Sequence, residues 1–307
     1  MTRYIVGRLF QAVVVVLFMS ILIFLLARAS GDPIDLLAPV DWTEEEIQQL
    51  RTQLGLDKPL HIQYGIFFKN ALHGDFGDSL RTGRPAIELV AKRLPASLWL
   101  AITSMLVSIA FGVPIGVYSA MKKGGALDTI GRMIAVLGQS MPLFWLGLLL
   151  VFVFSVLLGV LPTGGDVGWK YIILPAFTLG FYAVAGVMRL TRSSMLDVLN
   201  TEYIKLARAK GLSESVIIWK HALKNALLPV LTFILILFTM HLGGAVVVET
   251  VFSWPGVGLL LIEAVGWRDF PIMQTIVIML SSLFVLSNLL VDITYAYLNP
   301  KIRFGTR

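Results

Sequence analysis

The sequence predicts an all-α polytopic membrane protein with six transmembrane helices. Hydrophobic residues make up 57% of its 307 residues and charged residues only 14%, whereas soluble domains average about 45–50% and about 25%. The apolar residues form long runs, and about 20 helical residues are enough to cross a hydrocarbon core about 30 Å thick. The expected spans are 9–29, 96–121, 133–160, 171–188, 227–248 and 273–297.

The first apolar run has a second interpretation, a cleaved secretory signal. Arg3 and Arg8 precede the run, and Ala27-Arg28-Ala29 follows it in the manner of a small-residue cleavage site. The run from Leu9 to Leu26 is longer than the usual apolar region of a signal, about 7–15 residues. We therefore expect a retained span.

The distribution of Lys and Arg predicts the orientation. Segments 1–8, 122–132, 189–226 and 298–307 hold fifteen Lys and Arg against four acids, and cytoplasmic loops carry such an excess. Both termini are therefore expected in the cytoplasm. The net charge of +6 is explained by these loops, so no nucleic-acid partner is expected.

Segment 30–95 lies outside in this topology and is too long for a simple connector. A capping box from Thr43 to Glu46 predicts a helix that ends before Gly55, and further amphipathic helices are expected at 59–72 and 85–94. These helices could pack against the spans or receive an extracytoplasmic partner, and we favour packing. The predicted organisation is span 1–29, outer segment 30–95, a five-helix core 96–297 and tail 298–307.

A polar, basic stretch at 189–229 interrupts the second half of the chain. Gly211 suits a helix C-terminus that needs positive φ, and Ser213 can cap a second helix before Pro229 opens the next apolar run. The pattern predicts two short helices around a glycine. The first would carry on one face Leu196, Leu199, Tyr203 and Leu206.

No catalytic motif occurs in the sequence. It has no phosphate-binding loop, zinc-protease motif or nucleophile elbow, no Cys, and four dispersed His. Neither an enzyme nor a metal site is expected. Polar residues inside spans mark either a substrate path or ordinary bonds between helices; they are Gln139, His241, Asn288 and, nearer the cytoplasmic end, Asp292.

A turn is expected after the fifth span, where Pro255, Gly256 and Gly258 follow one another closely. Its aromatic residues Phe252 and Trp254 suit the membrane interface. The segment could anchor the chain, contact a partner or cover the mouth of a path.

Five groups of residues give the chain a resemblance to the permeases of bacterial dipeptide/oligopeptide ABC importers, B-type subunit. The resemblance covers nearly the whole chain, and it rests on Gly74–Gly77, Arg93–Leu98, Ser140-Met141-Pro142, the run from Tyr203 to Pro229, and Gly243–Gly256. It implies a type I ABC importer permease fold.

In that family the cytoplasmic loop between the fourth and fifth of the six spans docks into a cleft of an ATPase. Here Lys205-Leu206-Ala207 replaces the family's Glu-Ala-Ala, so the expectation rests on Gly211 and the apolar face. The residues expected to couple to the ATPase are Glu202, Tyr203, Leu206, Ala207, Arg208, Ala209, Lys210, Gly211, Leu212 and Ser213. The candidate translocation path comprises Gln139, Ser140, Pro142, His241 and Asn288, and the candidate outer mouth or docking site comprises Phe252, Trp254, Pro255 and Gly256.

The resemblance also implies the partners of the chain. They are a homologous C-type permease, one or two cytosolic ATPases that carry ATP and Mg, and an extracytoplasmic binding protein that delivers peptide; this chain itself would bind no cofactor. The expected location is a bacterial or archaeal cytoplasmic membrane. An ion-gradient-driven transporter or channel, or a scaffold for a signalling ATPase, are the alternatives. The sequence does not choose among dipeptides, longer peptides, nickel chelates, glutathione and sugars.

Overall fold

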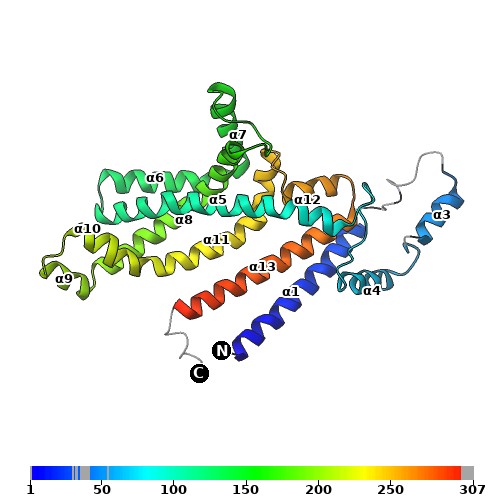
Figure 1. The fold of residues 1–307 in the computed structure, drawn as a ribbon, viewed down its shortest axis with the longest axis horizontal. Helices are drawn as coiled ribbons and strands as arrows, with labels where there is room; N and C mark the ends of the chain where they lie inside the picture. Colours follow the sequence, from blue (N-terminus) through cyan, green and yellow to red (C-terminus); the bar gives the residue numbers. More distant parts are fainter. Residues whose placement is uncertain (1, 30, 32–33, 35–41, 54, 299–307) are drawn as a thin grey trace. The chain divides into compact units, whose positions relative to one another are not determined.

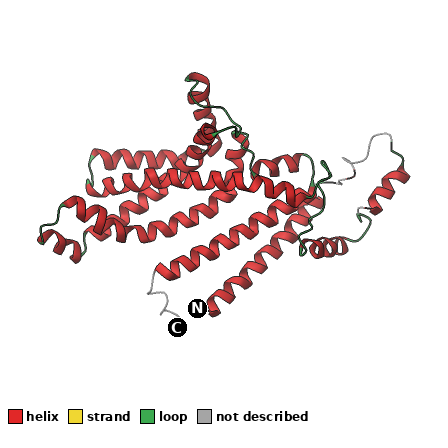
Figure 2. Cartoon of the chain, in the orientation of Figure 1, coloured by secondary structure: helices red, strands yellow, loops and turns green. Residues whose placement is uncertain are grey.

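The computed structural model describes residues 2–29, 31, 34, 42–53 and 55–298. Helices make up most of this part of the chain (Figures 1 and 2), and its isolated β-bridge joins Asp78 to Pro85. The helices are α1 (Thr2–Ala29), α3 (Glu44–Gln53), α4 (Leu60–Ala71), α5 (Ala86–Met121), α6 (Ala126–Ser140), α7 (Leu143–Leu150), η1 (Val151–Leu157), η2 (Trp169–Ile172), α8 (Ile173–Leu199), α9 (Glu202–Ala209), α10 (Glu214–Val216), η3 (Ile217–Ala222), α11 (Leu223–Val251), α12 (Val257–Gly266) and α13 (Phe270–Leu298).

The chain divides into two compact units. Unit 1 comprises Met1–Ser97 and Pro255–Leu286, and unit 2 comprises Leu98–Trp254 and Ser287–Arg307. These units differ from the four predicted segments, and that division of the chain stays a prediction.

The membrane-spanning helices follow the predicted pattern. Within the described residues, five helices are long and apolar enough to span: Gly7–Ala29, Ala86–Met121, Trp169–Leu199, Glu214–Gly243 and Phe270–Val291. The expected third span, whose entrance at 138–142 the sequence predicts to be broken at Pro142, is a pair of helices bent by 107° between Ser140 and Leu143. Met141 is extended (φ −86°, ψ 130°), as the residue before a proline prefers.

Two prolines do not end helices. The separate helix expected at 85–94 is wrong: α5 runs unbroken through Pro95, so the amphipathic segment and the second span are one helix. Pro229 likewise lies inside α11. Proline is tolerated in membrane helices where neighbouring groups satisfy the freed backbone.

Unit 2 is built around α8, which contacts α6, α7 and α11. Small residues bring α8 close to α5. A Cβ at Gly116 would lie 2.7 Å from the Met188 carbonyl oxygen, and one at Gly180 would lie 2.6 Å from that of Ser104. Such close approach at small residues is typical of helices that pack within a membrane.

Unit 1 is held by an apolar cluster that includes Ala27, Val90 and Ile276 and by a buried carboxylate. Asp269 accepts a hydrogen bond from the Ser79 hydroxyl at 2.6 Å. The two residues are 190 positions apart, so this contact joins the outer segment to the turn between α12 and α13.

The first two predicted helices of the outer segment are present in unit 1, as α3 and α4. The Thr43 N–H donates to Glu46 Oε2 at 2.8 Å, and the Glu46 N–H donates to Thr43 Oγ1 at 3.3 Å, which confirms the capping box. The bond from the Thr43 backbone lowers the pKa of the Glu46 carboxyl. Helix α4 packs on α1, where Tyr64 meets Ser20 through an O–O contact of 2.9 Å.

Candidate functional site

The basic stretch at 189–226 forms a projecting helical turn at one end of unit 2 (Figure 1). Helix α8 extends to Leu199, and α9 starts at Glu202. The expectation that Leu196 and Leu199 share a helix with Tyr203 and Leu206 is therefore wrong. Thr201 ends the continuity with an extended backbone (φ −76°, ψ 154°). A threonine followed by a glutamate is a signal for the start of a helix. The apolar spacing across this position favoured one continuous helix instead.

The turn after α9 is a Schellman motif centred on Gly211. The Gly211 N–H donates to the Arg208 carbonyl at 2.9 Å, and the Leu212 N–H donates to the Ala207 carbonyl at 3.3 Å. This pairing pattern needs a left-handed residue after the helix, and Gly211 has φ +78°. The predicted glycine cap is confirmed.

The helix after this turn is longer than expected. Ser213 stands at the N-cap position, although its side chain makes no capping hydrogen bond. From Glu214 the chain stays helical through α10, the π-helix η3 and α11 to Val251. The separate second helix is therefore wrong, because it is continuous with the fifth span.

Helix α9 buries one side chain and exposes its other apolar groups. Ile204 is 0% exposed and belongs to the same buried cluster as Met195 and Ile217, whereas Tyr203 is 42% and Leu206 57% exposed. Ile204 was not among the predicted residues. Its spacings in the sequence, four residues from Arg208 and nine from Met195, do not indicate that it is buried. Of the ten predicted coupling residues, Ala207 is half-buried and the rest are exposed.

Polar contacts brace α9 against the helix that follows. Arg208 Nε donates to Glu214 Oε1 at 2.7 Å, and this bond raises the pKa of Arg208, so the pair stays charged. Asn225 Nδ2 donates to the Tyr203 hydroxyl at 2.8 Å. The geometry of α9 is therefore fixed at both of its ends.

The predicted path residues have different surroundings, and their role as a path stays a prediction. Gln139 Oε1 accepts a bond from Arg189 at 2.8 Å, which is the ordinary interhelical role, and Ser140 Oγ donates to the Val136 carbonyl. Pro142 stands at the start of α7, and Asn288 is half-buried in α13. His241 is buried, and neither ring nitrogen has a hydrogen-bond partner there. The Asp292 side chain lies outside the described residues.

The turn after α11 differs from expectation in two respects. Phe252 is 1% and Trp254 5% exposed, so the interpretation of these aromatics as an interface belt is wrong. The left-handed residue is Ser253 (φ 47°), whereas Gly256 is extended and Gly258 lies within α12. Pro255 and Gly256 begin the second segment of unit 1. The outer-mouth role of these residues stays a prediction.

Comparison of the sequence with known protein families shows which family this chain belongs to. Residues 112–304 match the family described as binding-protein-dependent transport system inner membrane component, and residues 1–101 match the N-terminal part described for the same systems. The chain belongs to this family. It is therefore a multi-pass inner-membrane permease subunit of a binding-protein-dependent ABC importer, and the family's role is that of a permease component that is not itself catalytic.

The similarity to characterised members of the family extends over the full chain. The glutathione transport system permease protein GsiC of Salmonella choleraesuis (strain SC-B67) is 45% identical over 306 residues, which cover 99% of this chain and 100% of that protein. GsiC of Escherichia coli (strain K12) is 43% identical over 305 residues, with the same coverage.

Two solved structures share the fold. An amino acid ABC transporter with histidines has a TM-score of 0.54 at 14% identity, covering 68% of this chain and 94% of that one. The methionine ABC transporter MetNI, in inward-facing conformations, has a TM-score of 0.57 at 18% identity, covering 69% and 97%. The predicted type I ABC importer permease fold is confirmed.

Proposed function

We propose that this chain lines half of the path of an ATP-driven importer of peptides and peptide-like compounds. The observation that carries the substrate class is the full-length similarity to glutathione permeases, because glutathione is itself a tripeptide. A homologous second permease lines the other half, and an extracytoplasmic binding protein delivers the cargo. ATP and Mg bind to one or two separate ATPase subunits.

Helix α9 is the proposed contact with the ATPase. A short helix that leaves apolar side chains exposed can lie in the groove of a partner, and α9 with its turn exposes Tyr203, Leu206 and Leu212. The basic side chains of α9 give weaker support for this contact, because their charges are already paired within the chain. Lys205 is bonded to Glu202 and Arg208 to Glu214. ATP-driven closure of the ATPases would move α9, and the helices attached to it would open the path.

Co-purification with the ATPase tests the contact. Leu206→Asp places a charge in the centre of the exposed apolar surface, so we expect ATPase binding to weaken on the order of tenfold or more. Val167→Asp is the matched control, because Val167 is 82% exposed in the loop before η2. Equal amounts of bound ATPase in both variants would exclude α9 as the contact.

Uptake into vesicles tests the function and the substrate class. With both permeases, the ATPase and the binding protein present, glutathione or short peptides should accumulate only with ATP. Accumulation that instead follows an ion gradient without the ATPase would establish the secondary transporter. Ligands that co-purify with the binding protein identify the cargo, and a sugar or metal chelate there would contradict the peptide assignment.

A further inference from the structure

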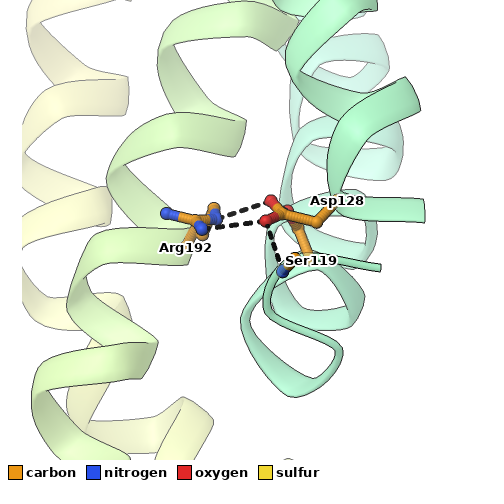
Figure 3. Close-up of polar contacts among 4 residues, drawn as sticks. Ser119, Asp128 and Arg192 are labelled. Carbon is orange, nitrogen blue, oxygen red and sulfur yellow. Dashed lines mark hydrogen bonds and ion pairs between the residues drawn. The ribbon is translucent and has the colours of Figure 1, made fainter. Parts of the chain in front are cut away.

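A buried carboxylate joins three segments of unit 2. Asp128, in the first turn of α6, is 1% exposed. It accepts hydrogen bonds from Arg192 Nε at 2.8 Å and Nη2 at 3.0 Å, both from α8 (Figure 3). The Ser119 hydroxyl of α5 and the Gly124 N–H also donate to it. A bidentate arginine–carboxylate pair is strong and directional, so it fixes the register of the helices it joins.

This cluster lies at the base of α9. Arg192 precedes the end of α8, Leu199, by seven residues, which is about 10 Å of helix, and α9 begins three residues later. One turn earlier on α8, Arg189 bonds to Gln139 at the other end of α6. The last part of α8 (189–199), which leads into α9 and is called its stem here, is thus bonded to α6 at two points. Asp128 also connects it to Ser119 of α5.

The apolar core makes the same connection. Ile204 of α9 belongs to one buried cluster with Met195 of α8 and with Val117 and Ala120 of α5. Apolar contacts between helices are non-directional, so they hold the helices together without fixing their register. The carboxylate cluster supplies the directional contact that this core lacks, and register is the best-attested use of buried ionic groups.

We propose that Asp128 and Arg192 are positioning residues for energy coupling. They hold the α5–α6 turn to the stem of α9, so that a displacement of α9 moves α5, α6 and α8 as one body. Without the pair, α9 can still bind its ATPase. The displacement of α9 and α8 would then make α8 slide along α6 and would not move α5 and α6. This inference rests on the proposed contact between α9 and an ATPase.

The test measures cargo transported per ATP hydrolysed by the complete importer in vesicles. Asp128→Asn is isosteric, and Arg192→Gln removes the other charge; each should lower this ratio about fivefold or more while the amount of bound ATPase stays at the wild-type level. Arg192→Lys should recover part of the ratio, because it keeps the charge but loses the bidentate geometry. The double variant should be no worse than the single variants.

The control is Lys123→Gln, which removes an exposed charge from the same α5–α6 turn and should leave the ratio unchanged. A merely structural role would reduce the yield of assembled complex without altering the ratio per complex. A wild-type ratio in Asp128→Asn and Arg192→Gln overturns the inference, and so does loss of bound ATPase from these variants. Retention of the ATPase by Leu206→Asp contradicts the α9 contact separately.

Discussion

Gly211 shows how one residue sets the shape of the exposed helical turn. Its φ of +78° is required by the two hydrogen bonds that close α9. A Cβ built at this position would meet no atom within 4 Å. Any penalty for a side chain here therefore comes from the backbone conformation alone, which for a residue other than glycine costs on the order of 1–3 kcal/mol.

A pair of substitutions at Gly211 separates backbone from side-chain effects. Gly211→Val should distort the turn, since β-branched residues are strongly disfavoured at positive φ, and should lower the cargo transported per ATP. Gly211→Asn should be close to wild type, because asparagine tolerates the left-handed region. Equal ratios for the two variants would show that the turn does not matter for coupling.

At the scale of the elements, α5 and α8 approach through glycines. Gly116 and Gly180 face backbone carbonyl oxygens of the opposite helix, and Ser108 Oγ donates to the Gly180 carbonyl at 3.1 Å. Backbone atoms cannot move aside as a flexible side chain can, so a larger residue must separate the helices. This contact depends on the absence of a side chain.

Gly116→Leu should therefore prevent folding of unit 2, with most of the protein aggregated on size exclusion in detergent. Overpacking typically costs about 1–3 kcal/mol, and more where backbone must move. Gly243→Leu is the control, because Gly243 lies in a helix with no atom near the position of a Cβ. A monodisperse Gly116→Leu protein would show that α5 and α8 can separate without loss of the fold.

The helices were predictable where hydropathy determined them and less so where prolines and caps did. Apolar length located the five spanning helices, and glycine chemistry located the turn at Gly211. The prolines behave differently: Pro142 follows the break that the sequence predicts, whereas Pro95 and Pro229 lie within continuous helices that the sequence divides. Periodicity cannot separate these cases, because the neighbours that satisfy the backbone come from distant parts of the chain.

The candidate site was only partly predictable for a related reason. The exposed residues of α9 follow from amphipathic spacing and the family resemblance. The ion pair of Asp128 and Arg192 joins residues 64 positions apart, and no spacing rule connects an inner-loop acid with a base on α8. Burial reversed the interpretation of Phe252 and Trp254, since an aromatic residue near a span end suits either the interface or a core.

At the scale of the whole molecule, charge and hydropathy act on separate parts of the chain. The apolar spans make it a multi-pass membrane protein, while its Lys and Arg predict the orientation. Fifteen of these cations lie in the segments expected inside, against four acids, and cytoplasmic loops retain such an excess. The predicted inside location of α9 is the condition for its proposed contact with a cytosolic ATPase.

The absence of cysteine from the sequence makes this orientation directly measurable with single introduced thiols. Asp57→Cys and Val167→Cys should react with a membrane-impermeant maleimide on intact cells, because both sites are exposed and lie in segments predicted to be outside. Lys123→Cys and Lys210→Cys, equally exposed, should react only after the membrane is opened. The cysteine-free chain gives the background. Labelling of Lys210→Cys on intact cells would place α9 outside, where no cytosolic ATPase could reach it.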